Sequence, residues 1–282
     1  QPLFLRFDPA LHGATSIPLK RPAFYAIVSS HALATNLLRK ATGRVDGFVI
    51  EGATAGGHNA PPRGALRLNE RGEPIYGERD EVDLAAMREL GAPFWLAGGF
   101  GNPEGVRAAV RQGAAGVQVG TPFAYSDESG LSAEVKRTVL GDVAAGRVGI
   151  FTDPRASPTG FPFKVIESPS LVQQDDSRIR LCDLGYLRTA ARRDDGKLAY
   201  KCSSEPLDTY VKSGGTVEDT VGRRCLCNGL MAVIGLPQLR KEDGSAEPPL
   251  LTSGDAVTEL AEVAKGRTSY PAADVLEYLL GR

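Results

Sequence analysis

His58 stands at the end of a glycine-rich turn that directly follows an apolar run. The run is Gly47-Phe48-Val49-Ile50, and the turn closes on Gly56-Gly57-His58. Glycines let a backbone approach a bulky planar ligand closely, and a histidine at the mouth of such a turn can move protons near neutral pH. A histidine considered alone is better explained as a surface residue after a flexible loop. The functional interpretation therefore depends on the motifs that follow.

Two later strand ends carry small residues. Ala97-Gly98-Gly99-Phe100-Gly101 follows one apolar run, and Gln118-Val119-Gly120-Thr121 ends the next. Free backbone N–H groups at the start of a helix favour anions, and in α/β barrels the loops after the last two strands usually bind phosphate. A single Gly-Gly pair is weak evidence. Two such ends at this spacing, preceded by Gly56-Gly57, predict a site for a phosphorylated ligand.

Residues 21–147 alternate short apolar runs with helical patterns, which is typical of β/α units around a parallel sheet. The predicted strands are residues 24–28, 47–50, 94–97 and 115–119, and the predicted helices are residues 32–41, 82–90 and 103–112. A closed (β/α)₈ barrel has eight strands, so this region predicts about half a barrel. Residues 59–80 are predicted to form a long loop, a feature that is usually functional in a compact domain.

These motifs together resemble the nitronate monooxygenase family, formerly called 2-nitropropane dioxygenase, which is similar to the FMN-dependent enoyl-ACP reductases. The resemblance covers roughly residues 21–140 and rests on order, spacing and strand context. Its residues are Ile50-Glu51-Gly52, Ala55-Gly56-Gly57-His58, Ala97-Gly98-Gly99-Phe100, Gly116-Val117-Gln118-Val119-Gly120-Thr121 and Glu128-Ser129.

The resemblance implies an α/β fold with the later β/α units of an FMN-binding TIM barrel. His58 matches the family's catalytic histidine, a base that takes an α-proton from a nitroalkane. The implied activity is FMN-dependent oxidation of nitronates by O₂ to a carbonyl compound and nitrite. The residues implied to bind FMN are Ser29, Gly57, Ala97, Gly98, Gly99, Gln118, Gly120 and Thr121.

Two alternatives remain open at this point. One is an enoyl-thioester reductase in which NAD(P)H reduces FMN; the other is a flavin-binding scaffold without turnover, which the presence of His58 disfavours. The expected partners are a small-molecule substrate such as a nitronate, O₂ and, as an open option, a second copy of the chain in a homodimer. The net charge of −1 argues against nucleic-acid binding, and no apolar stretch is long enough to span a membrane.

The two ends of the chain depart from the family pattern. Nothing between Gln1 and Lys20 resembles the flavin-contacting strand end with which family members begin. We therefore expect the missing barrel half upstream in a longer polypeptide or in a partner chain. Residues 1–147 are predicted as the barrel part and residues 148–282 as a mostly helical extension, with helices at 255–265 and 272–280. Within the extension, residues 151–163 could form a lid.

The four cysteines all lie in the extension, at positions 182, 202, 225 and 227. Four thiols are the number that a closed zinc site uses, but Cys225-Leu226-Cys227 is closer than typical zinc spacing. We therefore favour reduced structural cysteines and no metal. Few cysteines in a chain this long also favour a reducing, cytoplasmic compartment.

Three further side chains near the motifs leave a choice. Ser30 is expected to cap the helix that begins at His31. Glu51 either orients His58 or the flavin, or accepts backbone hydrogen bonds. Arg63 either meets an anionic substrate or faces solvent, and solvent is the favoured prediction.

Overall fold

The alternation of apolar runs and helices produces a parallel sheet in the computed structural model, which describes residues 8–13, 20–193, 195–241 and 243–282. Most of the Gln1–Lys20 segment lies outside the described residues. The sheet has four parallel strands in chain order: β1 (Tyr25–Val28), β2 (Gly47–Glu51), β3 (Phe94–Ala97) and β4 (Gly116–Gln118). All four strands were predicted, with ends that agree within two residues. The α/β class is confirmed.

Helices connect the strands in the order expected of β/α units. They are α1 (His31–Lys40), α2 (Leu84–Glu89) and α3 (Pro103–Arg111), with the short η1 (Pro9–His12) before the sheet and η2 (Glu78–Asp80) ahead of α2. Ser30 caps α1 as predicted, because its hydroxyl accepts a hydrogen bond from the Leu33 N–H at 3.1 Å. Apolar side chains of the sheet and these helices form one core, in which Phe48, Met87 and Phe94 are almost fully buried. This core fixes the strand ends that carry the glycine motifs.

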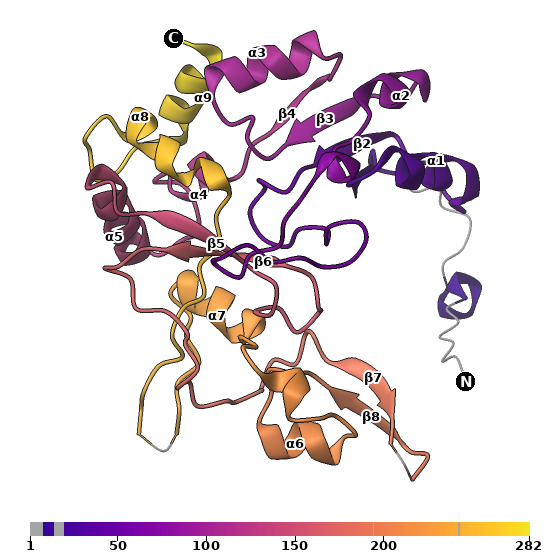
Figure 1. Cartoon of the computed structure of the whole chain (residues 1–282), viewed down its shortest axis with the longest axis vertical. Coiled ribbons are helices and arrows are strands. Elements are labelled where there is room, and N and C mark those ends of the chain that lie inside the picture. The colour runs from indigo at the N-terminus through magenta and orange to yellow at the C-terminus, as the bar shows by residue number, and fades with distance from the viewer. Residues whose placement is uncertain (1–7, 14–19, 194, 242) are drawn as a thin grey trace.

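A second core joins the two halves of the chain. The helices α4 (Thr121–Ala124) and α5 (Ala133–Ala144) meet η4 (Asp255–Glu259), α8 (Leu260–Ala264) and α9 (Ala272–Leu280). Val139 and Leu140 pack there with Leu260, Val263 and Val275, and α9 lies against α3 (Figure 1). The predicted helices at 255–265 and 272–280 are confirmed. The domain boundary at 147 stays a prediction, and apolar packing is continuous across it.

The rest of the extension is less helical than predicted. It contains two antiparallel pairs, β5 (Gly149–Asp153) with β6 (Phe163–Glu167) and β7 (Thr189–Arg192) with β8 (Leu198–Lys201). Its other elements are α6 (Leu207–Lys212), η3 (Glu218–Thr220) and α7 (Leu226–Val233), joined by long loops (Figure 1). The expectation of a mostly helical extension is wrong. The prolines and glycines between positions 152 and 162 lie in the connection between the two strands of the β5–β6 hairpin.

The sheet is open at β1 among the described residues, because β1 pairs with β2 alone. Tyr25 and Ile27 point away from the core and are exposed, whereas Ala26 and Val28 are buried. One face of β1 is therefore uncovered among the described residues. Among the described residues, no helix has both the length and the apolar content needed to cross a lipid bilayer.

Candidate active site

The glycine turns that follow β2, β3 and β4 surround one cavity of about 330 Å³. Seven of the eight residues predicted to bind the cofactor line it: Gly57, Ala97, Gly98, Gly99, Gln118, Gly120 and Thr121. They meet because the carboxyl ends of parallel strands lie at the same edge of a sheet. The structure therefore brings these seven residues together at one cavity.

Two of these glycines leave room for a ligand. A Cβ added at Gly57 or at Gly120 would meet no atom within 4 Å, so a side chain at either position would project into open space. Gly57 also has φ +80°, a conformation that side chains with a Cβ rarely adopt. Gly98 serves a different purpose, since its Cβ would lie 2.7 Å from the backbone nitrogen of Ala55. It lets the β2 and β3 turns approach each other.

Polar groups at the cavity are suited to an anion. Among the described residues, the backbone N–H groups of Gly99 and Gly120 have no hydrogen-bond acceptor. Thr121 adds a hydroxyl that accepts from the Gly254 N–H at 2.9 Å and can itself donate to a ligand. The helix that Thr121 begins has four residues, so the individual N–H groups matter more here than a helix dipole.

A segment of the extension completes the cavity, and the sequence did not predict it. Thr252, Ser253, Gly254 and Ala256 line the same space as the glycine turns. The Thr252 hydroxyl accepts a hydrogen bond from the Gly57 N–H at 2.7 Å. A Cβ at Gly56 would lie 2.8 Å from the Gly254 nitrogen, so position 56 must be glycine for these two segments to come this close. The run of small residues at 252–254 was the available signal.

His58 lies beside the cavity and is not one of its lining residues. Its Nε2 lies 2.7 Å from Ser157 Oγ and 3.4 Å from Thr159 Oγ1, and its ring meets the edge of Phe163 at a centroid distance of 4.9 Å. Partial burial lowers the pKa of His58. The ring is therefore neutral near pH 7 and can act as a base. Ser157 belongs to the segment at 151–163 that was predicted as a lid.

Ser29, Glu51 and Arg63 meet in a smaller neighbouring cavity of about 40 Å³. The Arg63 guanidinium donates to the backbone carbonyls of Ser29 and Arg79, so the side chain is exposed but anchored. Glu51 lines both cavities, and burial raises its pKa. Among the described residues, the His58 ring bonds to Ser157 and Thr159 and not to Glu51. Ser29 is thus separated from the other predicted cofactor residues.

A buried lysine fastens the extension to the cavity wall. The Lys164 ammonium lies 2.7 Å from Asp255 Oδ1 and 2.9 Å from Thr152 Oγ1. Asp255 in turn donates its backbone N–H to the carbonyl of Thr54, a residue that lines the main cavity. These contacts hold the start of η4 against the turn after β2.

The parallel sheet of β1–β4 with its connecting helices gives the chain an α/β fold, and the glycine-lined cavity lies at the carboxyl ends of its strands. The chain superposes on the structure of FabK from Thermotoga maritima with a TM-score of 0.51 and 18% identity, covering 92% of this chain and 60% of that chain. This likeness establishes the fold alone. The family model for nitronate monooxygenase matches residues 17–147. Members of that family are FMN-dependent oxidoreductases.

Two relatives extend the comparison. The (3aS,4S,5R,7aS)-5-hydroxy-7a-methyl-1-oxo-octahydro-1H-indene-4-carboxyl-CoA dehydrogenase of Mycobacterium tuberculosis is 29% identical over 231 residues, covering 81% of this chain and 58% of that protein. The nitronate monooxygenase of Pseudomonas aeruginosa is 36% identical over 117 residues, covering 42% of this chain and 32% of that protein. The chain thus spans less than two thirds of the length of each relative. The match to the M. tuberculosis protein covers 231 residues, more than the 147 that precede the extension, so it includes part of the extension.

Proposed function

We propose that this protein is an FMN-dependent oxidoreductase that oxidises nitronates and nitroalkanes with O₂ to carbonyl compounds and nitrite. The observation that carries the proposal is the cavity at the strand ends, where open space over Gly57 and Gly120 adjoins free backbone N–H groups. The match of residues 17–147 to the family model for nitronate monooxygenase supports the same activity.

The cavity fits a flavin phosphate by the chemistry of its wall. Gly98, Gly99, Gly120 and Thr121 would hold the phosphate with backbone N–H groups and one hydroxyl. Gly57, Ala97 and Gln118 would lie along the rest of the cofactor, and we keep Ser29 as a more distant contact. When bound, FMN supplies an electron acceptor for the substrate that returns the electrons to O₂.

His58 would remove the α-proton of a neutral nitroalkane. In the tautomer in which Nε2–H donates to the buried hydroxyl of Ser157, Nδ1 carries the free lone pair that accepts this proton. The Ser157 hydroxyl is itself 2.7 Å from Thr159 Oγ1, so it can donate onward while accepting from His58. Ser157 and Thr159 are therefore positioning residues that set the tautomer, and Phe163 fixes the ring plane.

Flavin spectroscopy tests the proposal. The purified full-length protein is expected to be yellow, and its flavin absorbance is expected to bleach when a nitronate is added without oxygen. Readmitting O₂ should restore the absorbance and release nitrite. A flavin-loaded protein that neither bleaches with nitronates nor releases nitrite would contradict the proposed activity.

A second candidate function is flavin-dependent reduction or oxidation of an acyl thioester. It is favoured by the M. tuberculosis relative, whose name describes a CoA-thioester dehydrogenase and whose match continues into the extension that the family model leaves out. Bleaching by NAD(P)H alone, followed by reoxidation with an enoyl-CoA, would select this function. Bleaching by neither reagent would select the flavin-binding scaffold.

A further inference from the structure

All four cysteines of the chain converge on one small cavity, although they lie on separate segments. Cys182, Cys202, Cys225 and Cys227 line a space of about 10 Å³ together with Arg188 and Glu205. Cys182 lies in the loop before β7, and Cys202 directly follows β8. Cys225 and Cys227 lie at the start of α7. A volume of this size accommodates about one small atom or ion. None of the four is in a disulfide.

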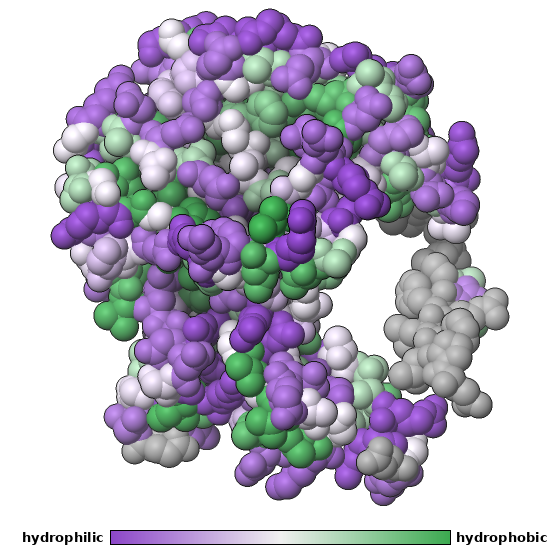
Figure 2. Space-filling model, viewed as in Figure 1, coloured by the Kyte–Doolittle hydropathy of each residue, from purple (hydrophilic) through white to green (hydrophobic). Residues whose placement is uncertain are grey.

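The surrounding part of the extension has little apolar core to hold it together. The core cluster nearest the cysteines consists of Ala156, Phe163, Leu226 and Leu250. Large apolar side chains of the same part are exposed instead, including Tyr186, Tyr200 and Leu239. Figure 2 shows hydrophobic residues in green among hydrophilic ones over the lower part of the molecule, where Figure 1 places α6 and β8. Small parts of a protein that bury little apolar surface are usually stabilised by a metal or a disulfide.

We propose that Cys182, Cys202, Cys225 and Cys227 bind one structural zinc ion that fixes the extension around α7. Four thiolates are the full ligand set of a closed, tetrahedral zinc site. Because the ligands come from three segments, zinc binding would tie β8, α7 and the loop before β7 to one point. The short Cys225-Leu226-Cys227 spacing is then no obstacle, since this pair needs to supply only two of the four ligands.

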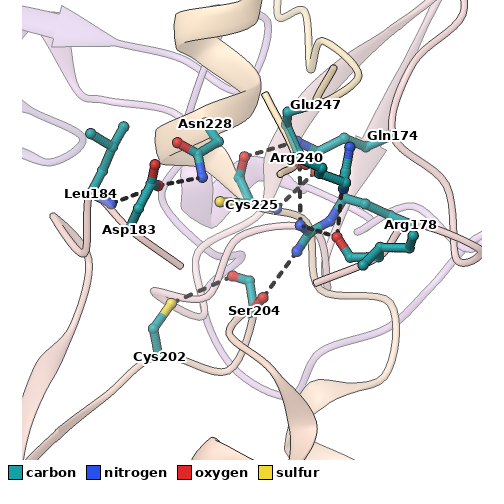
Figure 3. Close-up of polar contacts among 11 residues, drawn as sticks. Gln174, Arg178, Asp183, Leu184, Cys202, Ser204, Cys225, Asn228, Arg240 and Glu247 are labelled. Carbon is teal, nitrogen blue, oxygen red and sulfur yellow. Dashed lines mark hydrogen bonds and ion pairs between the residues drawn. The ribbon is translucent and has the colours of Figure 1, made fainter. Parts of the chain in front are cut away.

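The backbone at Cys225 is already held in place by Gln174, as Figure 3 shows, and Glu205 holds that at Cys202. Gln174 accepts a hydrogen bond from the Cys225 N–H at 2.8 Å and donates to the Cys225 carbonyl at 3.0 Å. Glu205 accepts from the Cys202 N–H at 3.3 Å and donates its own N–H to the Cys202 carbonyl. Both Gln174 and Glu205 act on the main chain, whereas the Cys202 thiol itself contacts the Ser204 hydroxyl at 3.5 Å.

The guanidinium group of Arg188 also lies beside the thiols. Arg188 lines the same cavity and pairs with the fully buried carboxylate of Glu205 at 2.8 Å. Its remaining N–H groups can donate to thiolate sulfur and offset the negative charge of a four-thiolate site. Among the described residues, no three donors are already arranged to hold a metal. Binding therefore requires the thiols to rotate inward, toward the Zn–S distance of about 2.3 Å.

Metal analysis tests the proposal independently of the flavin. The full-length protein, purified without chelators, is expected to contain about one zinc per chain, which a mercurial reagent releases as it titrates the thiols. The cobalt-substituted protein is expected to show the strong thiolate-to-cobalt absorption of a tetrahedral site. Zinc content does not depend on which substrate is oxidised, so this test can fail while the proposed activity stands.

Single substitutions distinguish the loss of a zinc-binding thiol from a general loss of folding. Cys202→Ser and Cys227→Ser are each expected to lose zinc and to become more sensitive to proteolysis in the extension. Ser204→Ala, whose hydroxyl lies 3.5 Å from Cys202 Sγ, removes no thiol and is expected to retain zinc. Wild-type protein that holds no zinc and whose native thiols react equally fast with and without EDTA would overturn the proposal. Iron in place of zinc would also overturn it.

Discussion

The His58 ring combines a depressed pKa with a fixed hydrogen bond. Partial burial disfavours the charged imidazolium, so the ring stays neutral to a lower pH than a free histidine. Ser157, which holds Nε2, lies 99 positions away in the chain. This separation explains why the sequence indicated the histidine but not its hydroxyl partner.

The pH profile of the reaction follows from this depressed pKa. The neutral ring is the active base, so kcat/KM for a neutral nitroalkane should be constant at high pH and fall as pH drops through the pKa of His58. We expect that fall below pH 6.5, the ordinary value for histidine. An acidic limb centred above that pH would contradict the role of burial.

Gly120 offers a direct test of the cavity. Its φ of −114° does not require glycine, and a Cβ there meets no protein atom. Gly120→Val should therefore fold normally but occupy ligand space, weakening FMN binding by about tenfold or more. Gly43→Val makes the same change at another position with open space around it. Unchanged FMN affinity in Gly120→Val, measured by flavin fluorescence, would place the phosphate elsewhere.

At the scale of elements, one ion pair between a buried lysine and an exposed aspartate connects β6 to η4. The Lys164 side chain is 3% exposed, and its partners Asp255 and Thr152 lie on η4 and β5. The same η4 segment covers the turn after β2, through the hydrogen bond from the Asp255 N–H to the Thr54 carbonyl. The pair therefore couples the hairpin to one wall of the cavity.

Lys164→Met should lower the free energy of unfolding by about 1.5–3 kcal/mol, because two charge-assisted hydrogen bonds are lost. Lys197→Met is the matched control, since that side chain is 78% exposed and 3.9 Å from Asp195. The control should change stability by less than about 0.5 kcal/mol. Chemical denaturation of both variants measures the difference. Equal free energies of unfolding for Lys164→Met and Lys197→Met would mean that the Lys164–Asp255 pair contributes no net stabilisation.

At the scale of the whole molecule, local patterns predicted the sheet but not what covers it. The strands at 47–51 and 94–97 and the helix at 272–280 were predictable because each carries its own apolar period and end signals. The hairpin of β5 and β6 was not, because its prolines and glycines suggested an irregular segment. The predicted cavity residues Gly57, Gly98 and Gly120 meet because parallel strand ends share an edge.

The remaining cavity wall could not be predicted, because its contacts join distant parts of the chain. Thr252 meets Gly57 across 195 positions, and no local period encodes such a contact. The match to the M. tuberculosis CoA-thioester dehydrogenase also includes part of the extension, because it is longer than the 147 residues that precede the extension. The main cavity is therefore lined by two regions of the sequence, and the family model covers only the first of them.

The most direct test of the central claim compares two substrates in the His58→Ala variant with FMN bound. A neutral nitroalkane must lose a proton before oxidation, whereas a preformed nitronate has already lost it. We predict that kcat/KM for the nitroalkane falls by about 10²–10⁴-fold, while that for the nitronate changes far less. Undiminished oxidation of the nitroalkane, or an equal loss with both substrates, would contradict the assignment of His58 as the base.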